Sequence, residues 1–174
     1  QILISEFNVD AVVNTGVAGA IHSSLDVNDI VISTEAIQYD VDATAFGYAK
    51  GQIPQMENSV FEANEILINA AYESSLDQVK DKGFKIVKGR VATGDIFISS
   101  KELKEELEND FKAYCGEMEG GAIAHACYLN NIPFVIIRAM SDKADGSADV
   151  TYDEFVVEAA ENSKDIVLKM LRAL

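Results

Sequence analysis

The sequence predicts an α/β fold with three layers, α/β/α, built around a mixed but largely parallel central sheet. Segments with strand-like and helix-like patterns alternate along its 174 residues, which is typical of that class. The apolar runs are short and rich in β-branched residues, as in buried strands. One of them, in residues 134–145, turns abruptly polar at Arg138, Ser141 and Asp142. Ligands of α/β sheets bind beyond the carboxyl ends of such strands, so we expect a site there.

The composition restricts the function. Hydrophobic residues make up 48% of the chain, enough for one domain over residues 1–174 with a real core. The net charge of −15 argues against nucleic-acid and anionic-membrane partners. Neither a membrane-length apolar window nor a signal peptide is visible. The two cysteines, Cys115 and Cys127, are too few for a disulfide framework, so we expect a cytoplasmic, reduced protein.

The first elements are a helix end and two strands. Residues 1–7 resemble the end of an apolar helix, so we expect the chain to start inside a domain. Residues 10–19 predict a strand that ends in a turn containing Gly16 and Gly19. A second strand is predicted over residues 29–37, with alternate residues on opposite faces.

Residues 38–55 show neither a helical nor a strand period. They contain two aromatic residues, Phe46 and Tyr48, and Pro54. Long loops in compact domains are often functional or form interfaces. This segment is therefore either an oligomer contact or an ordinary surface loop.

The rest of the chain alternates between the two kinds of element. Apolar residues at helical spacing, with Ser100 as an N-cap and Gly83 as a stop signal, indicate the helices. We predict helices over residues 62–82, 100–111, 122–129 and 152–174, and strands over residues 84–94 and 113–119.

The ends of four predicted strands carry unusual residues, in residues 14–19, 94–98, 117–119 and 138–142. If these ends open at one edge of the sheet, the carboxylates of Glu117, Glu119 and Asp142 converge with Arg138. Such a group could carry out acid–base chemistry or bind a sugar.

Structural roles are open alternatives for each of these residues. Glu119 could simply favour the start of a helix, Arg138 could neutralise a glutamate, and Asp142 could cap a loop. Phe97 could be an ordinary core aromatic residue. His125 lies among small apolar residues, which favours a packed histidine over a ligand, and no spacing of histidines and cysteines predicts a zinc site. We predict no metal and no cofactor.

Four segments together resemble one family. Residues 14–19 (NTGVAG), 45–48 (AFGY), 117–125 (EMEGGAIAH) and 138–142 (RAMSD) are similar to those of 5′-methylthioadenosine/S-adenosylhomocysteine nucleosidases, in the nucleoside phosphorylase-type superfamily. The resemblance runs along the whole sequence. It implies a homodimeric hydrolase of methionine salvage that splits the N-glycosidic bond of adenine thionucleosides into adenine and a 5-thioribose product.

The resemblance also implies roles for individual residues. Asp142 matches the acid that protonates adenine N7, and Ser141 the residue that orients it. The other matching positions are the adenine-stacking ring (Phe97), the backbone that binds the base edge (Ile98), the ribose-hydroxyl ligand (Glu119), the wall under the sugar (Met118), the polar groups around water and ribose (Glu117 and Arg138), a ligand-facing turn (Gly19), and the loop that a partner subunit lends to the 5′-alkylthio pocket (Phe46 and Pro54).

The implied chemistry makes a physical demand on Asp142. Adenine leaves poorly as an anion, so protonation of N7 lowers the barrier. An aspartic acid that carries this proton near neutral pH must be buried, because burial raises a carboxyl pKa. Charge that develops on the ribose resembles an oxocarbenium ion, which Glu119 could help to stabilise.

One feature of the family has no counterpart in the sequence. Its first strand and helix, with the carboxylate that activates water, are expected to precede residue 1. Whether residues 1–174 alone cleave a nucleoside therefore stays open. A purine nucleoside phosphorylase, a futalosine hydrolase and a non-catalytic nucleoside-binding module are alternatives. Phosphorylases commonly place an arginine in the turn where this chain has Asn14, Thr15 and Gly16, which favours water as the nucleophile.

Overall fold

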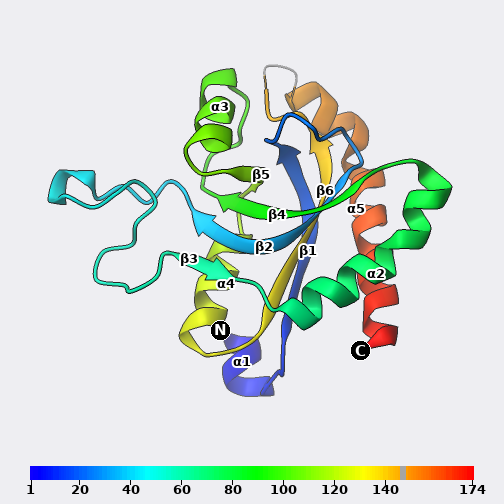
Figure 1. Ribbon diagram of the computed structural model, residues 1–174, viewed down its shortest axis with the longest axis horizontal. Coiled ribbons are helices and arrows are strands. Elements are labelled where there is room, and N and C mark those ends of the chain that lie inside the picture. Colours follow the sequence, from blue (N-terminus) through cyan, green and yellow to red (C-terminus); the bar gives the residue numbers. More distant parts are fainter. Residues whose placement is uncertain (146–147) are drawn as a thin grey trace.

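A computed structural model describes the backbone of residues 1–145 and 148–174, and the side chains of these residues except 77–82 and 148–151. Helices and strands alternate, which confirms the predicted α/β class (Figure 1). The helices are α1 (Ile2–Phe7), α2 (Glu65–Lys82), α3 (Lys101–Asn109), α4 (Gly120–Leu129) and α5 (Ala148–Ala173), with the short 3₁₀ helix η1 (Thr44–Phe46). The strands are β1 (Val12–Ala20), β2 (Ile30–Gln38), β3 (Val60–Glu62), β4 (Ile86–Thr93), β5 (Ala113–Glu117) and β6 (Phe134–Asp142).

The sheet is mixed, and its longer ladders are parallel. The strand order is β3-β2-β4-β5-β1-β6. β1 runs parallel to β6, and β4 runs parallel to both β2 and β5, whereas the shorter β1–β5, β2–β3 and β2–β6 ladders are antiparallel. Because β2 also pairs with β6, five of the strands close into a ring rather than an open sheet.

This closure changes how the strand ends meet. The strands form two parallel groups, β2–β4–β5 and β1–β6, which run antiparallel to each other. The sequence suggested that the carboxyl ends of the strands open at one edge of a flat sheet. They do not, because the two groups run in opposite directions. They meet where β1 and β5 cross, with Gly19 opposite Gly116.

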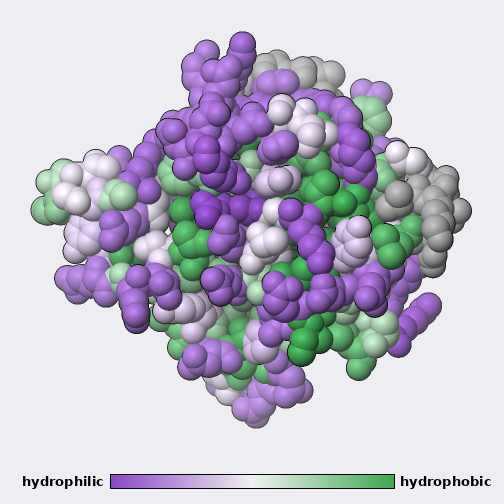
Figure 2. Space-filling model, in the orientation of Figure 1, coloured by the Kyte–Doolittle hydropathy of each residue, from purple (hydrophilic) through white to green (hydrophobic). Residues whose placement is uncertain are grey.

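Helices cover the strands on both sides. α5 packs against β1 and β6 and contacts α2, whereas α4 packs against β2 and β4, and α3 against β5 (Figure 1). Because both faces are covered, the residues from Ile30 to Ser33 are all fully buried, so the predicted alternation in this strand is wrong. Hydrophilic residues dominate the visible surface in Figure 2. No helix among the described residues is long and apolar enough to span a membrane.

Several predicted boundaries shift in the structure. β1 continues to Ala20, so Gly16 and Gly19 lie within the strand and not in a turn, although a bulge occurs between Ala18 and Gly19. The polar residues of 138–142 likewise belong to β6. The short strand β3 was missed, and α2 begins only after Asn64, whose side chain accepts the backbone N–H of Leu67 at 3.2 Å.

Two local predictions are confirmed. Ser100 caps α3, because its hydroxyl accepts the backbone N–H of Leu103 at 3.2 Å. Gly83 follows α2 with a φ of 76°, a conformation that glycine adopts readily. Residues 39–59, between β2 and β3, extend from the molecule as an arm (left in Figure 1) that contains η1.

Candidate active site

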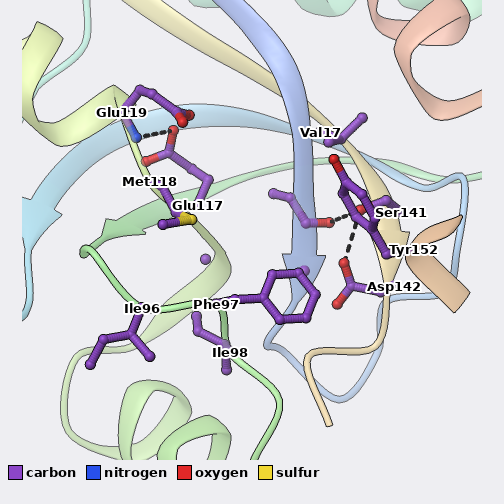
Figure 3. A pocket seen from close by; sticks show the side chains of 13 residues that line it. Val17, Ile96, Phe97, Ile98, Glu117, Met118, Glu119, Ser141, Asp142 and Tyr152 are labelled. Atoms are coloured by element: carbon purple, nitrogen blue, oxygen red, sulfur yellow. Dashed lines mark hydrogen bonds between the residues drawn. The ribbon is translucent and has the colours of Figure 1, made fainter. Parts of the chain in front are cut away.

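A cavity of about 320 Å³ lies where the ends of β1, β5 and β6 meet the segment that follows β4 (Figure 3). This volume is within the range of small-molecule sites. The lining comprises residues 17–19, 96–98, 116–119 and 141–142, together with Tyr152 from α5. The structure thus brings together part of each of the segments in which the sequence placed a site.

Asp142 is the buried acid of this cavity, with only 2% of its surface exposed. The hydroxyl of Ser141 donates to its Oδ2 at 2.9 Å, and the backbone N–H of Ala144 donates to its Oδ1 at 2.7 Å. Burial raises the pKa of Asp142 above its ordinary value, and these two hydrogen bonds offset only part of that effect. The carboxyl group is therefore biased towards its protonated form.

Gly19 allows β1 to pass close to this acid. A Cβ atom on Gly19 would lie 2.8 Å from Oδ1 of Asp142 and 2.9 Å from Cβ of Ala144. Ala144 itself has a φ of 51°, in the left-handed region. Any larger residue at position 19 would displace the turn that holds the Asp142 carboxyl group.

An aromatic wall lies beside Asp142. The Phe97 ring is 44% exposed, and Tyr152 meets it edge-on with ring centroids 5.9 Å apart. Ile98 is buried and Ile96 is half exposed. A flat apolar ligand could therefore stack on Phe97 within reach of Asp142 (Figure 3). Sequence reasoning missed Tyr152, since it looks like an ordinary residue of an amphipathic helix.

The other side of the cavity carries an ion pair. Arg138, behind the lining, donates to Glu117 Oε2, to Asn14 Oδ1 at 2.8 Å and to Glu119 Oε2 at 3.4 Å. Glu117 is 6% exposed, whereas the Glu119 side chain is 64% exposed and Met118 is 43% exposed. Glu119 and Met118 therefore offer a carboxylate and an apolar surface to a ligand.

The structural alternatives are partly observed as well. Arg138 does neutralise Glu117, and Asp142 does cap the turn after β6 through the N–H of Ala144. These contacts hold the two side chains at the cavity, so a structural role and a role in ligand binding are compatible. His125 stacks on Phe61 with ring centroids 4.9 Å apart, as a packed histidine does.

Three predicted site residues do not line the cavity: Arg138, which lies behind the lining, and Phe46 and Pro54. Phe46, on the arm, is 85% exposed, and Pro54 is also exposed; neither lines the cavity of its own chain. Cys115 and Cys127 are free and buried. Among the side chains that the structure describes, no group of three or more histidine, cysteine or acidic residues could hold a metal ion.

Comparison with known proteins gives the same family as the sequence motifs. The sequence model of the phosphorylase superfamily matches residues 1–172. The chain belongs to this superfamily. A 5′-methylthioadenosine/S-adenosylhomocysteine nucleosidase from Staphylococcus carnosus is 45% identical over an alignment of 174 residues that covers 99% of this chain and 74% of that protein. The resemblance to this nucleosidase family is thereby confirmed.

Solved structures of the superfamily agree in fold. The Neisseria meningitidis nucleosidase in complex with methylthio-immucillin-A superposes with a TM-score of 0.91 at 43% identity, covering 99% of this chain and 73% of that one. The futalosine hydrolase of Helicobacter pylori also gives a TM-score of 0.91, at 34% identity, with 99% and 72% covered.

Proposed function

We propose that this protein hydrolyses the N-glycosidic bond of 5′-methylthioadenosine and S-adenosylhomocysteine. The observation that carries the proposal is the buried Asp142 carboxyl group, with its raised pKa, in the same cavity as the Phe97 ring. The relatives with nucleosidase activity and the bound nucleoside analogue of the Neisseria structure support an adenine nucleoside as the ligand.

The geometry supports the following steps. Adenine stacks on Phe97, and the backbone of Ile98 binds the edge of the base. Asp142 transfers its proton to N7 as the bond between C1′ and N9 breaks and its electron pair moves into the base. Water adds to C1′ and releases a proton to the solvent, which gives the 5-thioribose product, and Asp142 takes up a proton from the solvent before the next turnover. Proton transfer of this kind contributes roughly 10²–10⁴-fold to the rate.

The ribose lies at the opposite end of the cavity in this proposal. The exposed Glu119 carboxylate accepts hydrogen bonds from the ribose hydroxyl groups, and Met118 forms the apolar surface below the sugar. Arg138 and Glu117 supply the polar surroundings of the ribose and the water. These contacts place the positive charge that develops at C1′ near a carboxylate, which lowers the energy of the transition state.

The arm suggests how two subunits combine. We propose a homodimer in which residues 38–55 of one subunit, including Phe46 and Pro54, complete the 5′-alkylthio pocket of the other. An aromatic side chain that is 85% exposed at position 46 supports this arrangement. We place the enzyme in the cytoplasm and in methionine salvage; its two free, buried cysteines fit a reducing compartment.

Futalosine is the second candidate substrate, because a futalosine hydrolase has the same fold at 34% identity. A phosphorylase is less well supported. No arginine occurs among Asn14, Thr15 and Gly16, and the Asn14 side chain already accepts a hydrogen bond from Arg138 at 2.8 Å. The described part of this strand thus offers no additional cation to phosphate.

Adenine release distinguishes these functions. The purified protein is incubated with methylthioadenosine, adenosylhomocysteine or futalosine, with and without phosphate, and the products are separated by chromatography. We expect release of adenine from the first two substrates at a rate that is independent of phosphate. Strict dependence on phosphate indicates a phosphorylase, cleavage of futalosine alone indicates the hydrolase, and binding without cleavage indicates a binding module.

A further inference from the structure

Helix α4 begins with two glycines whose backbone N–H groups are bound by side chains from two strands. Its N-cap residue, Glu119, makes no capping hydrogen bond through its own side chain. Instead, the N–H of Gly120 donates to Glu117 Oε2 at 2.7 Å, and the N–H of Gly121 donates to Thr93 Oγ1 at 2.6 Å. Residues at the ends of β5 and β4 therefore supply the acceptors that a helix start requires.

Thr93 makes a second hydrogen bond that links the two strands. Its hydroxyl group donates to Glu117 Oε1, and the two residues lie opposite each other in the β4–β5 ladder. Thr93 is only 4% exposed, so water cannot readily replace it. The hydroxyl thus binds one oxygen of the Glu117 carboxylate, while Arg138 and the Gly120 N–H bind the other.

The glycines permit this close approach. A Cβ atom on Gly121 would lie 2.8 Å from both Cβ and Oγ1 of Thr93, and one on Gly120 would lie 2.9 Å from Oε2 of Glu117. Any larger side chain at either position would push Thr93 or Glu117 away from the helix. Glycine at positions 120 and 121 therefore leaves the space that the side chains of Glu117 and Thr93 occupy.

We propose that Thr93 is a positioning residue for the ribose end of the site. It fixes the rotamer of Glu117, and through Glu117 it holds the Arg138 guanidinium and the backbone N–H of Glu119, which donates to Glu117 Oε2 at 3.3 Å. The inference rests on the proposed role of Glu119 as the ribose ligand. Thr93 does not line the cavity, so it acts only through its neighbours.

The test compares a nucleoside with a free base. Thr93→Val keeps the shape of the side chain but removes the hydroxyl, which leaves a buried carboxylate oxygen without its donor. We expect kcat/KM for methylthioadenosine to fall by about tenfold, the size of one hydrogen bond to a charged group. The inhibition constant of adenine, which binds only at the Phe97 and Asp142 end, should change by less than about twofold. Thr93→Ser, which keeps the hydroxyl, should restore most of the loss.

Two further variants keep the test decisive. Ser75→Ala removes a fully buried hydroxyl that donates to the Tyr72 carbonyl within α2, away from the cavity, and it should leave both constants unchanged. Gly121→Ala pushes on Thr93 from the helix side and should reproduce the selective loss, even if Thr93→Val does not fold.

The outcomes separate the two proposals. Unchanged kcat/KM in both Thr93→Val and Gly121→Ala, or an equal loss for nucleoside and adenine, overturns the positioning role. If the unmodified protein itself neither binds nor cleaves methylthioadenosine, the proposed function fails first, and this inference fails with it.

Discussion

Two buried carboxyl groups face the same cavity from opposite sides, and their surroundings differ (Figure 3). Asp142 is 2% exposed and Glu117 is 6% exposed, so burial is nearly equal. Glu117 faces the Arg138 guanidinium, a hydroxyl and backbone N–H groups. Asp142 has one hydroxyl and one backbone N–H, and no cation within salt-bridge distance among the described side chains.

This difference shows that two carboxyl groups with nearly equal burial can have very different partners, and we infer that the partners distinguish their proposed roles. Moving a carboxylate out of water is costly unless a cation compensates for the loss of solvation. At Glu117 the guanidinium of Arg138 provides that compensation in an ion pair. At Asp142 both hydrogen-bond donors are neutral and the charge of Lys104 has a smaller effect than either, so burial dominates and raises the pKa. The proposed acid and the ion pair thus lie on opposite sides of one cavity.

The largest effect should come from removing the proton donor. Asp142→Asn keeps the size of the side chain but cannot transfer a proton to the leaving base. We expect kcat for methylthioadenosine to fall by roughly 10²–10⁴-fold, while the dissociation constant of a nucleoside inhibitor changes only a few-fold. Steady-state kinetics and calorimetry measure the two quantities.

A matched control is Asp165→Asn, on the surface of α5, where the carboxylate is 44% exposed beside Lys164. It should leave kcat unchanged. Turnover by Asp142→Asn at the rate of the unmodified protein contradicts the acid role.

The next effect should be on stability, at the ion-pair end. Arg138→Met removes the cation and leaves Glu117 buried without its charged partner. Loss of one member of a buried pair typically costs about 3–5 kcal/mol, which urea denaturation measures as a lower free energy of unfolding. The double variant Arg138→Met with Glu117→Gln should recover part of this loss. If Arg138→Met is as stable as the unmodified protein, the ion pair between Arg138 and Glu117 does not stabilise the fold.

A smaller effect should appear in the pH dependence of stability. The pKa of Asp142 is higher in the folded protein than in the unfolded chain, so protonation favours folding. Its stabilising contribution is fully present below the unfolded pKa of about 3.9 and is lost as the pH rises through the folded pKa. Compared with the unmodified protein, Asp142→Asn should therefore gain relative stability across that window. If the free energy of unfolding depends on pH in the same way in both proteins, the pKa of Asp142 is not raised.

Local sequence signals predicted much of the fold and part of the site. Short β-branched runs identified β1, β2, β4 and β6, because buried strands select such residues whatever their partners are. β5 was also predicted, although its sequence AYCGE contains no β-branched residue. The candidate residues Phe97, Glu117 and Asp142 were found because polar or aromatic residues follow or end predicted strands, whereas Ile98 came from the family resemblance alone. Their arrangement at one cavity is observed, whereas their roles stay predictions.

What the sequence could not predict depends on pairing between distant segments. Closure of the ring requires β2 to pair with β6, and neither strand carries a local sign of it. Thr93 looks like an ordinary strand residue until the β4–β5 register places it opposite Glu117. Tyr152 reaches the cavity only because α5 packs against β1 and β6.

The protonation state of Asp142 is the most direct test of this account. The protein is labelled with ¹³C at its aspartate carboxyl carbons, and their chemical shifts are followed by NMR as the pH is raised, with Asp142→Asn identifying the signal of Asp142. The account predicts a signal that titrates above the ordinary aspartate value of about 3.9 and is absent from the variant. If the Asp142 signal titrates at or below that value, the carboxyl group is ionised when the base must leave, and it cannot be the acid.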